Sequence, residues 1–250
     1  MNQRKNSLSP QERPRNSKQR EFVTSEKLTE DKIHTMGITA YRVLFTCLLL
    51  AVIPAVSIFA SFQQGYDLYK RGKYYEAEEV LLREKELSPG NLDVYAVLGW
   101  CYLNTGRYKD AIDISNEGLK INAGDTRFLT TIGRAYLELK RYTDALTYLK
   151  RSITLNPDYS YNYFYAGRVY LNQGKYILAE TAFSAAIKLQ SDRYIFYRFR
   201  GEVYEKMANY RAAEEDYKEA LTLKPNDPRL KESLIRVISK QTEQTAEYEE

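Results

Sequence analysis

Two consecutive stretches of the chain decide its fold. Residues 126–159 read TRFLTTIGRAYLELKRYTDALTYLKRSITLNPDY, and residues 160–193 read SYNYFYAGRVYLNQGKYILAETAFSAAIKLQSDR. Placed one above the other, they share a glycine, two tyrosines and an alanine at the same places. The glycine belongs to a column that recurs every 34 residues along most of the chain. This column contains Gly65, Gly99, Gly133, Gly167 and Gly201.

Three further columns keep the same period. The position three residues after each glycine holds Leu68, Tyr102, Tyr136, Tyr170 and Tyr204 in turn. The position nine residues after it holds Tyr74, Tyr108, Tyr142, Tyr176 and Tyr210. The position twelve residues after it holds Ala77, Ala111, Ala145, Ala179 and Ala213. Agreement of four columns in five copies indicates a repeat architecture.

The columns are typical of antiparallel helix pairs. Glycine and alanine permit close approach of the two backbones, so we expect both columns where the first and second helices of a pair meet. A tyrosine three residues after the glycine shares its helical face, one turn along, so we place the tyrosine columns in the core. The polar turns Asn104-Thr105-Gly106 and Asn156-Pro157-Asp158 are expected to end a first and a second helix.

The period and the columns resemble those of the tetratricopeptide repeat (TPR) family, which has 34-residue units. The resemblance covers five units, at 58–91, 92–125, 126–159, 160–193 and 194–227, or 170 residues of the 250. It implies an all-α, right-handed α-solenoid in which each pair covers the apolar face of its neighbour. The first unit departs from the pattern, since Ser61 and Gln64 stand where large apolar residues are usual.

The last segment, 228–250, predicts a helix that caps the array. A solenoid end would otherwise leave apolar surface in water. We assign Leu230, Leu234, Ile235 and Ile238 to its apolar face, and we expect the acidic end to fray from Glu243 onward.

The N-terminal part divides into two zones. Residues 1–42 are polar and lack helical or strand periodicity, so we interpret them as a disordered basic tail. Residues 43–62, VLFTCLLLAVIPAVSIFASF, carry no charge and are long enough to cross a bilayer as a helix, so they predict a transmembrane helix. A cleaved secretory signal is the alternative, with residues 55–57 as its cleavage site. The segment leaves no linker before the first repeat.

The charge distribution favours one topology. The tail has nine basic and five acidic side chains, which accounts for the whole net charge of +4, and residues 63–250 are neutral. A short basic tail tends to remain cytoplasmic. We therefore predict a single-pass bacterial inner-membrane protein with its N-terminus in the cytoplasm and its repeats in the periplasm. A eukaryotic organelle receptor with cytosolic repeats is the alternative.

The sequence offers no catalytic, cofactor or metal site that we can identify. The single histidine, His34, lies in the tail, and Cys101 lies within a repeat helix, where a buried structural thiol is expected. The glycines recur at 34 residues, which does not make a phosphate-binding loop. Neutral repeats lack the basic stripe that nucleic-acid binding requires. We therefore predict a protein that is not an enzyme, has no cofactor and binds no nucleic acid.

Binding to other proteins remains, and the TPR resemblance implies that it uses the concave face formed by the first helices. The residues that this register assigns to the groove are Trp100, Arg127, Thr130, Arg134, Tyr161, Phe164, Arg168, Arg198 and Glu202. Arginines among aromatic rings suit an acidic, aromatic or extended peptide. The alternative is that these arginines are solvated or pair with Glu138, Glu202 and Glu205. The residues with which some TPR proteins clamp a terminal carboxylate are absent.

These features together predict a membrane-anchored scaffold that mediates protein–protein interactions in an envelope-associated assembly. The alternatives are a receptor for an extended acidic or aromatic peptide, including one of the organelle import type, and a regulatory subunit of a membrane enzyme. Self-association into a homo-oligomer is also left open by the sequence.

Overall fold

The computed structural model describes the backbone of residues 61–249 and the side chains of residues 61–244. The chain divides into two units, Met1–Ser57 and Ile58–Glu250, and the following description concerns the second. All of its regular secondary structure in the described residues is α-helical. This confirms the expected all-α architecture.

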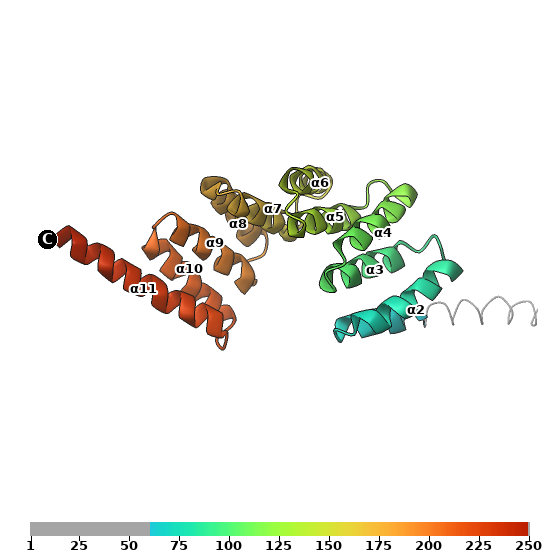
Figure 1. Ribbon diagram of the computed structural model, residues 1–250, viewed down its shortest axis with the longest axis horizontal. Coiled ribbons are helices and arrows are strands. Elements are labelled where there is room, and N and C mark those ends of the chain that lie inside the picture. The colour runs from blue at the N-terminus through green and yellow to red at the C-terminus, as the bar shows by residue number, and fades with distance from the viewer. Residues whose placement is uncertain (1–60, 250) are drawn as a thin grey trace, which may run out of the picture. The chain divides into compact units, whose positions relative to one another are not determined.

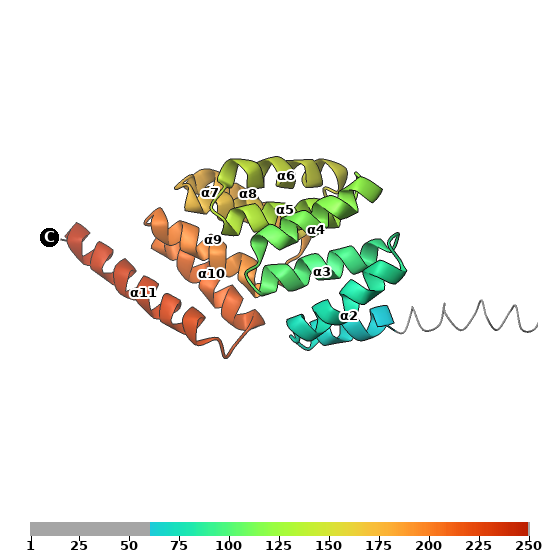
Figure 2. The same ribbon diagram turned by 45° about the vertical axis from the view of Figure 1, so that its right-hand side comes forward.

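The helices follow one another at short intervals. Residues 61–70 form the first described helix. The others are α2 (Tyr74–Leu87), α3 (Leu92–Asn104), α4 (Tyr108–Ile121), α5 (Thr126–Glu138), α6 (Tyr142–Leu155), α7 (Ser160–Asn172), α8 (Tyr176–Leu189), α9 (Tyr194–Lys206), α10 (Tyr210–Leu223) and α11 (Pro228–Glu249). Figures 1 and 2 show them succeeding one another in chain order. The helix ends fall at the predicted polar turns.

The helices are arranged as a solenoid of antiparallel pairs. Each helix from α2 to α10 packs against the next helix in the chain. The first helices α3, α5, α7 and α9 also contact one another in succession. Contacts of similar extent between successive second helices are absent from the described part of the chain. The first helices therefore line the inner side of the solenoid.

The glycine and alanine columns lie where a first and a second helix meet. A Cβ atom added to Gly133 would lie 2.7 Å from Leu149 Cγ, and one added to Gly167 would lie 2.7 Å from Phe183 Cε1. The five alanines of the column are fully buried. Both columns therefore occupy the predicted close-approach positions.

The tyrosine columns line the core more than they fill it. Tyr102 is buried, whereas the other tyrosines of both columns are half-buried. Their rings pack against the buried apolar clusters between successive helices. Their placement in the core is confirmed in part, because these half-buried side chains keep part of their surface in solvent. Cys101 is buried as expected.

The C-terminal helix α11 covers the last pair with a face that agrees only in part with the one we predicted. Leu230 and Val237 are fully buried and Leu234 is half-buried, whereas Ile235 is 67% and Ile238 is 42% exposed. The assignment of the two isoleucines to the buried face was wrong, because the stripe that meets α10 runs through positions 230, 234 and 237. The helical backbone continues past Glu243 to Glu249, and the fraying of the acidic end stays a prediction.

Residues 43–60 of the predicted membrane span lie outside the described residues, as do the basic tail and the alternative cleavage site. Along the described residues, no helix has the length and apolar character needed to cross a membrane. The anchor therefore stays a prediction from the sequence.

Candidate functional site

A hollow of about 730 Å³ opens on the inner side of the solenoid, among residues from four first helices and the turns that precede them. We call it the aromatic cavity. Of the described side chains that line it, six are tyrosine or tryptophan, three are arginine, and none is aspartate or glutamate. It is lined by Tyr66, Tyr69, Trp100, Leu103, Thr126, Arg127, Thr130, Thr131, Arg134, Asn156, Tyr159, Tyr161, Tyr165 and Arg193.

Arg134, on α5, is the distinctive charge of this cavity. Its guanidinium carbon lies 5.7 Å from the centre of the Tyr165 ring. Within residues 61–244 it has no carboxylate partner. A guanidinium over an aromatic face keeps its five donors available for a ligand. Arg134 is therefore a half-buried cation that is available to an incoming anion.

The reason for the missing partner can be read from the repeat register. Arg168 occupies the equivalent position one unit later, and its Nη1 donates to Glu138, 30 residues earlier, at 3.0 Å. The residue 30 positions before Arg134 is Asn104, which has no charge. The preceding unit thus supplies a carboxylate to Arg168 and an uncharged amide at the corresponding place for Arg134.

The phenols around Arg134 stay protonated near neutral pH. Burial raises the pKa of Tyr69 and of Tyr165, and it raises the pKa of Tyr159 to about 12. The positive charge of Arg134 offsets part of this increase in all three. A protonated phenol can donate a hydrogen bond, so the cavity combines the Arg134 cation with several neutral donors.

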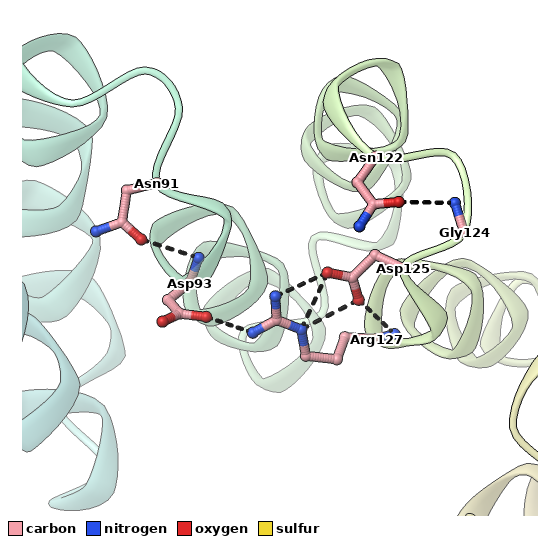
Figure 3. Close-up of polar contacts among 6 residues, drawn as sticks. All are labelled: Asn91, Asp93, Asn122, Gly124, Asp125 and Arg127. Carbon is pink, nitrogen blue, oxygen red and sulfur yellow. Dashed lines mark hydrogen bonds and ion pairs between the residues drawn. The ribbon is translucent and has the colours of Figure 1, made fainter.

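Arg127 also lines the cavity, but its charge is neutralised. Its side chain donates to Asp125 Oδ2 at 2.7 Å and reaches Asp93, the residue 34 positions earlier (Figure 3). Asp125 at the same time caps α5 by accepting the backbone N–H of Arg127 at 3.0 Å. The Asn91 side chain caps α3 in the same way. Arg127 therefore joins two repeats, and its availability to a ligand is lower than that of Arg134.

The predicted groove residues divide into three groups. Trp100, Arg127, Thr130, Arg134 and Tyr161 all line the aromatic cavity. Thr130 is itself mostly buried, so it forms the floor of the cavity rather than a rim.

Arg198 and Glu202 line a separate hollow of about 440 Å³ between α9, α10 and α11. Phe164 is 5% exposed in an aromatic cluster with Phe183 and Phe196, so its ring does not reach a ligand.

Arg168, like Phe164, has its side chain engaged within the protein. Besides its ion pair with Glu138, its guanidinium lies 5.4 Å from the centre of the Phe199 ring. For Arg168 the alternative interpretation, pairing with Glu138, is the one that the structure shows.

Sequence reasoning left out several residues of the cavity, although the 34-residue period contained a signal for them. Residues at one register position share one place in every unit, so a residue that lines the cavity in one unit points to its equivalent in the next. Among the lining residues that were left out, three pairs have this spacing, namely Tyr69 with Leu103, Thr131 with Tyr165, and Tyr159 with Arg193.

The described residues hold no group of three or more histidine, cysteine, aspartate or glutamate side chains that could bind a metal ion. Burial raises the pKa of the Cys101 thiol to about 12, with a smaller contribution from Glu78. The side chains that meet in the cavity can stack, donate hydrogen bonds and pair with an anion.

The stack of antiparallel helix pairs is the architecture of an α-solenoid repeat protein. Its inner side has an aromatic, cationic hollow. The tetratricopeptide-repeat family model matches residues 130–176 and 164–228, and the model described as anaphase-promoting complex, cyclosome, subunit 3 matches residues 86–152. The chain is a TPR repeat protein, and it mediates protein–protein interactions as a scaffold of this kind. No protein of curated function matches its sequence.

Solved structures show the same fold. The TPR protein TTC0263 of Thermus thermophilus is 22% identical, with a TM-score of 0.64, and the match covers 74% of this chain and 99% of that one. Pseudomonas aeruginosa pilF is 22% identical, with a TM-score of 0.64, over 76% of this chain and 88% of that one. YrrB, described as a TPR protein with an unusual peptide-binding site, is 22% identical, with a TM-score of 0.50, over 68% and 87%.

Proposed function

We propose that the chain is a membrane-anchored, non-enzymatic scaffold that holds a partner protein by an extended acidic segment bound in the aromatic cavity. The observation that carries this proposal is the guanidinium of Arg134, which has no carboxylate partner within residues 61–244 and lies among neutral aromatic side chains. An anion that enters gains a charge-assisted hydrogen bond, worth about 1.5–3 kcal/mol, without displacing a described carboxylate of the protein.

The walls of the cavity favour aromatic or aliphatic side chains next to the acidic group. Tyr69 and Trp100 lie with their ring centres 5.7 Å apart, and Tyr161 adds a further ring to the lining. Tyrosine, tryptophan and arginine are the residues most often found at binding hot spots, because they combine large contact area with polar ends. The ligand is therefore an extended segment in which an acidic residue stands close to an apolar one.

The membrane part of the proposal rests on the sequence. Residues 43–62 form an uncharged segment of spanning length, and the positive charge of the chain precedes it. We place the basic tail in the cytoplasm and the repeats in the periplasm of a bacterium, where they recruit components of an envelope assembly.

Trp100 provides a specific binding assay, because it is the single tryptophan of the chain and lines the cavity. Titration with a peptide that contains aspartate, glutamate and phenylalanine should change its fluorescence saturably. Arg134→Gln should weaken binding by about tenfold or more, which corresponds to ~1.4 kcal/mol. Lys109→Gln, an exposed residue at the start of α4 outside the cavity, is the matched control and should leave affinity unchanged.

Two outcomes would contradict the proposal that the aromatic cavity binds an acidic segment. One is equal affinity for the peptide in which asparagine and glutamine replace the acids, and the other is unchanged affinity of the Arg134→Gln variant. The topology is tested separately by protease added to intact spheroplasts. We expect digestion of the 63–250 portion, whereas its protection would place the repeats on the other side of the membrane.

A further inference from the structure

A third hollow lies at the turn between α7 and α8, away from the aromatic cavity, and has a volume of about 570 Å³. Three large apolar side chains in it face solvent: Ile177 is 72%, Leu178 48% and Met207 43% exposed. Lys175, Gly174 and the half-buried Tyr176 complete its lining. We call this surface the turn patch.

The turn patch exists because the fourth unit breaks a pattern that the first three units keep. In each of those units, the basic residue just before the second helix pairs with an acidic residue three positions later. The pairs are Lys73–Glu76 at 2.9 Å, Arg107–Asp110 at 2.6 Å and Arg141–Asp144 at 2.8 Å. In the fourth unit Leu178 occupies the acidic position, so Lys175 has no ion pair within residues 61–244.

The same change has two effects at one place. It removes the carboxylate that would neutralise Lys175, and it adds an aliphatic side chain beside Ile177 and Met207. None of the described side chains that line the hollow is aspartate or glutamate. Clustered apolar side chains with a polar rim on a soluble surface mark an interaction site, and a cation beside them that lacks a partner specifies the charge of the ligand.

We propose that the turn patch binds an acidic, apolar segment of a partner protein, separate from the ligand of the aromatic cavity. An aliphatic or aromatic side chain of the partner fills the hollow, and a neighbouring carboxylate takes the place that Glu76, Asp110 and Asp144 have in the other units. Three exposed apolar side chains and one cation form a small surface, and because bilayer binding scales with the buried apolar area, this surface favours a segment of a partner protein over a bilayer. Two separate surfaces allow the scaffold to hold two partners at once.

The third unit provides the replacement sequence for the variant that tests this proposal. Ile177→Thr with Leu178→Asp changes Tyr-Ile-Leu-Ala at the start of α8 to Tyr-Thr-Asp-Ala, the sequence with which α6 already begins. This variant removes the apolar surface and restores an acidic partner for Lys175. Since the third unit folds with that sequence, we expect an unchanged melting temperature.

The probe is a displayed library of short peptides selected on the full chain in nanodiscs of neutral lipid. We expect one class of peptides whose affinity falls about tenfold or more in the double variant, or ~1.4 kcal/mol, but is unchanged by Arg134→Gln. These peptides should contain apolar and acidic residues. Their affinity should fall when their acidic residues are replaced by amides, and it should also fall in the Lys175→Gln variant of the chain.

The proposal is overturned if no selected peptide loses affinity in the Ile177→Thr, Leu178→Asp variant. It is also overturned if the peptides that do lose affinity there bind the Lys175→Gln variant as tightly as the natural chain. It is also overturned if the double variant loses only binding to vesicles of phosphatidylserine. Peptides that respond to Arg134→Gln alone report on the aromatic cavity, so the failure of one proposal is distinguishable from the failure of the other.

Discussion

The side-chain oxygen of Asn162 accepts a hydrogen bond from the Thr130 hydroxyl at 2.7 Å, directly under the aromatic cavity. The Asn162 amide donates to Ser152 Oγ at 2.9 Å, and Ser152 donates onward to the Thr126 carbonyl. The side chains of Thr130, Ser152 and Asn162 are buried. The neighbouring junctions have small or apolar residues at these positions, namely Ala96, Gly118 and Phe128 before it and Phe164, Ala186 and Phe196 after it.

Removing one member of this network should destabilise the array. Asn162→Ala leaves the buried Ser152 hydroxyl without its donor and creates a small cavity. We expect a loss of about 1–3 kcal/mol in the free energy of unfolding, because an unsatisfied buried polar group costs roughly that much. Chemical denaturation of the natural chain and the variant measures it, with the exposed Asn172→Ala as the control.

A compensating variant tests whether the polar network itself is needed. Thr130→Ala, Ser152→Gly and Asn162→Phe together reproduce the preceding junction, where the Phe128 ring covers Gly118 so closely that an added Cβ would lie 2.5 Å from Cε2. We expect the triple variant to recover most of the stability that Asn162→Ala loses, because apolar replacement of all partners is nearly neutral. A triple variant less stable than the single one would contradict this account.

Ala208 stands at a turn position where three of the five units have a glycine with positive φ. Three of the corresponding turns have Gly72, Gly106 and Gly174 at φ +77°, +76° and +71°, whereas Lys140 has φ +59° and Ala208 has φ +54°. A Cβ in this left-handed region is strained. We expect Ala208→Gly to raise stability by about 0.5–1 kcal/mol, because relief of roughly 1–2 kcal/mol of left-handed strain exceeds the entropic cost of glycine, which is roughly 0.5–1 kcal/mol. Gly174→Ala should lower stability by a similar amount. Thermal melts of both variants check the opposite signs, and a change of the same sign in both would contradict the interpretation.

The periodic residues made the fold predictable, while the contacts of individual side chains were less so. Gly133 and Gly167 could be placed from their spacing alone, because every unit repeats the same close approach. Whether Arg134 has a carboxylate partner depends on the preceding unit. That unit has Asn104 at the position where the next one has Glu138, the partner of Arg168. Ile235 was assigned to the wrong face because adjacent stripes of one helix are both apolar, and only the packing on α10 distinguishes them.

Cys101 should be unreactive in the folded chain. Its side chain is 1% exposed, and burial raises the thiol pKa to about 12, so little thiolate is present at pH 8. The chain has one other cysteine, Cys47, which is replaced by serine so that the reagent reports on Cys101 alone. Since the thiolate is the reactive form, a thiol reagent should modify this Cys47→Ser variant only after denaturation. The reagent's absorbance with and without denaturant measures this, and rapid modification of the native variant would contradict the buried position.

The attachment of α11 should depend on pH through Glu205. This carboxylate accepts hydrogen bonds from Arg236 on α11 at 2.9 and 3.0 Å and from the Tyr217 hydroxyl at 2.6 Å. Burial acts to raise its pKa, but Arg236 and Tyr217 outweigh that effect, so the pKa lies below the ordinary value of 4.5. A lowered folded-state pKa stabilises the fold above the unfolded pKa, and this contribution is lost as the pH falls through the folded value.

We therefore expect the protection of α11 amides, measured as their exchange rate relative to the intrinsic rate at each pH, to fall below a pH of about 4, in the range where glutamates titrate. Glu205→Gln should cost about 1 kcal/mol near neutral pH, since one charge-assisted contact to a partly exposed arginine is lost. In this variant the protection of the α11 amides should vary less with pH than in the natural chain. Glu219→Gln, an exposed residue on α10, controls for the loss of one carboxylate. An equal pH dependence in the natural chain and the Glu205→Gln variant would show that another group holds α11 in place.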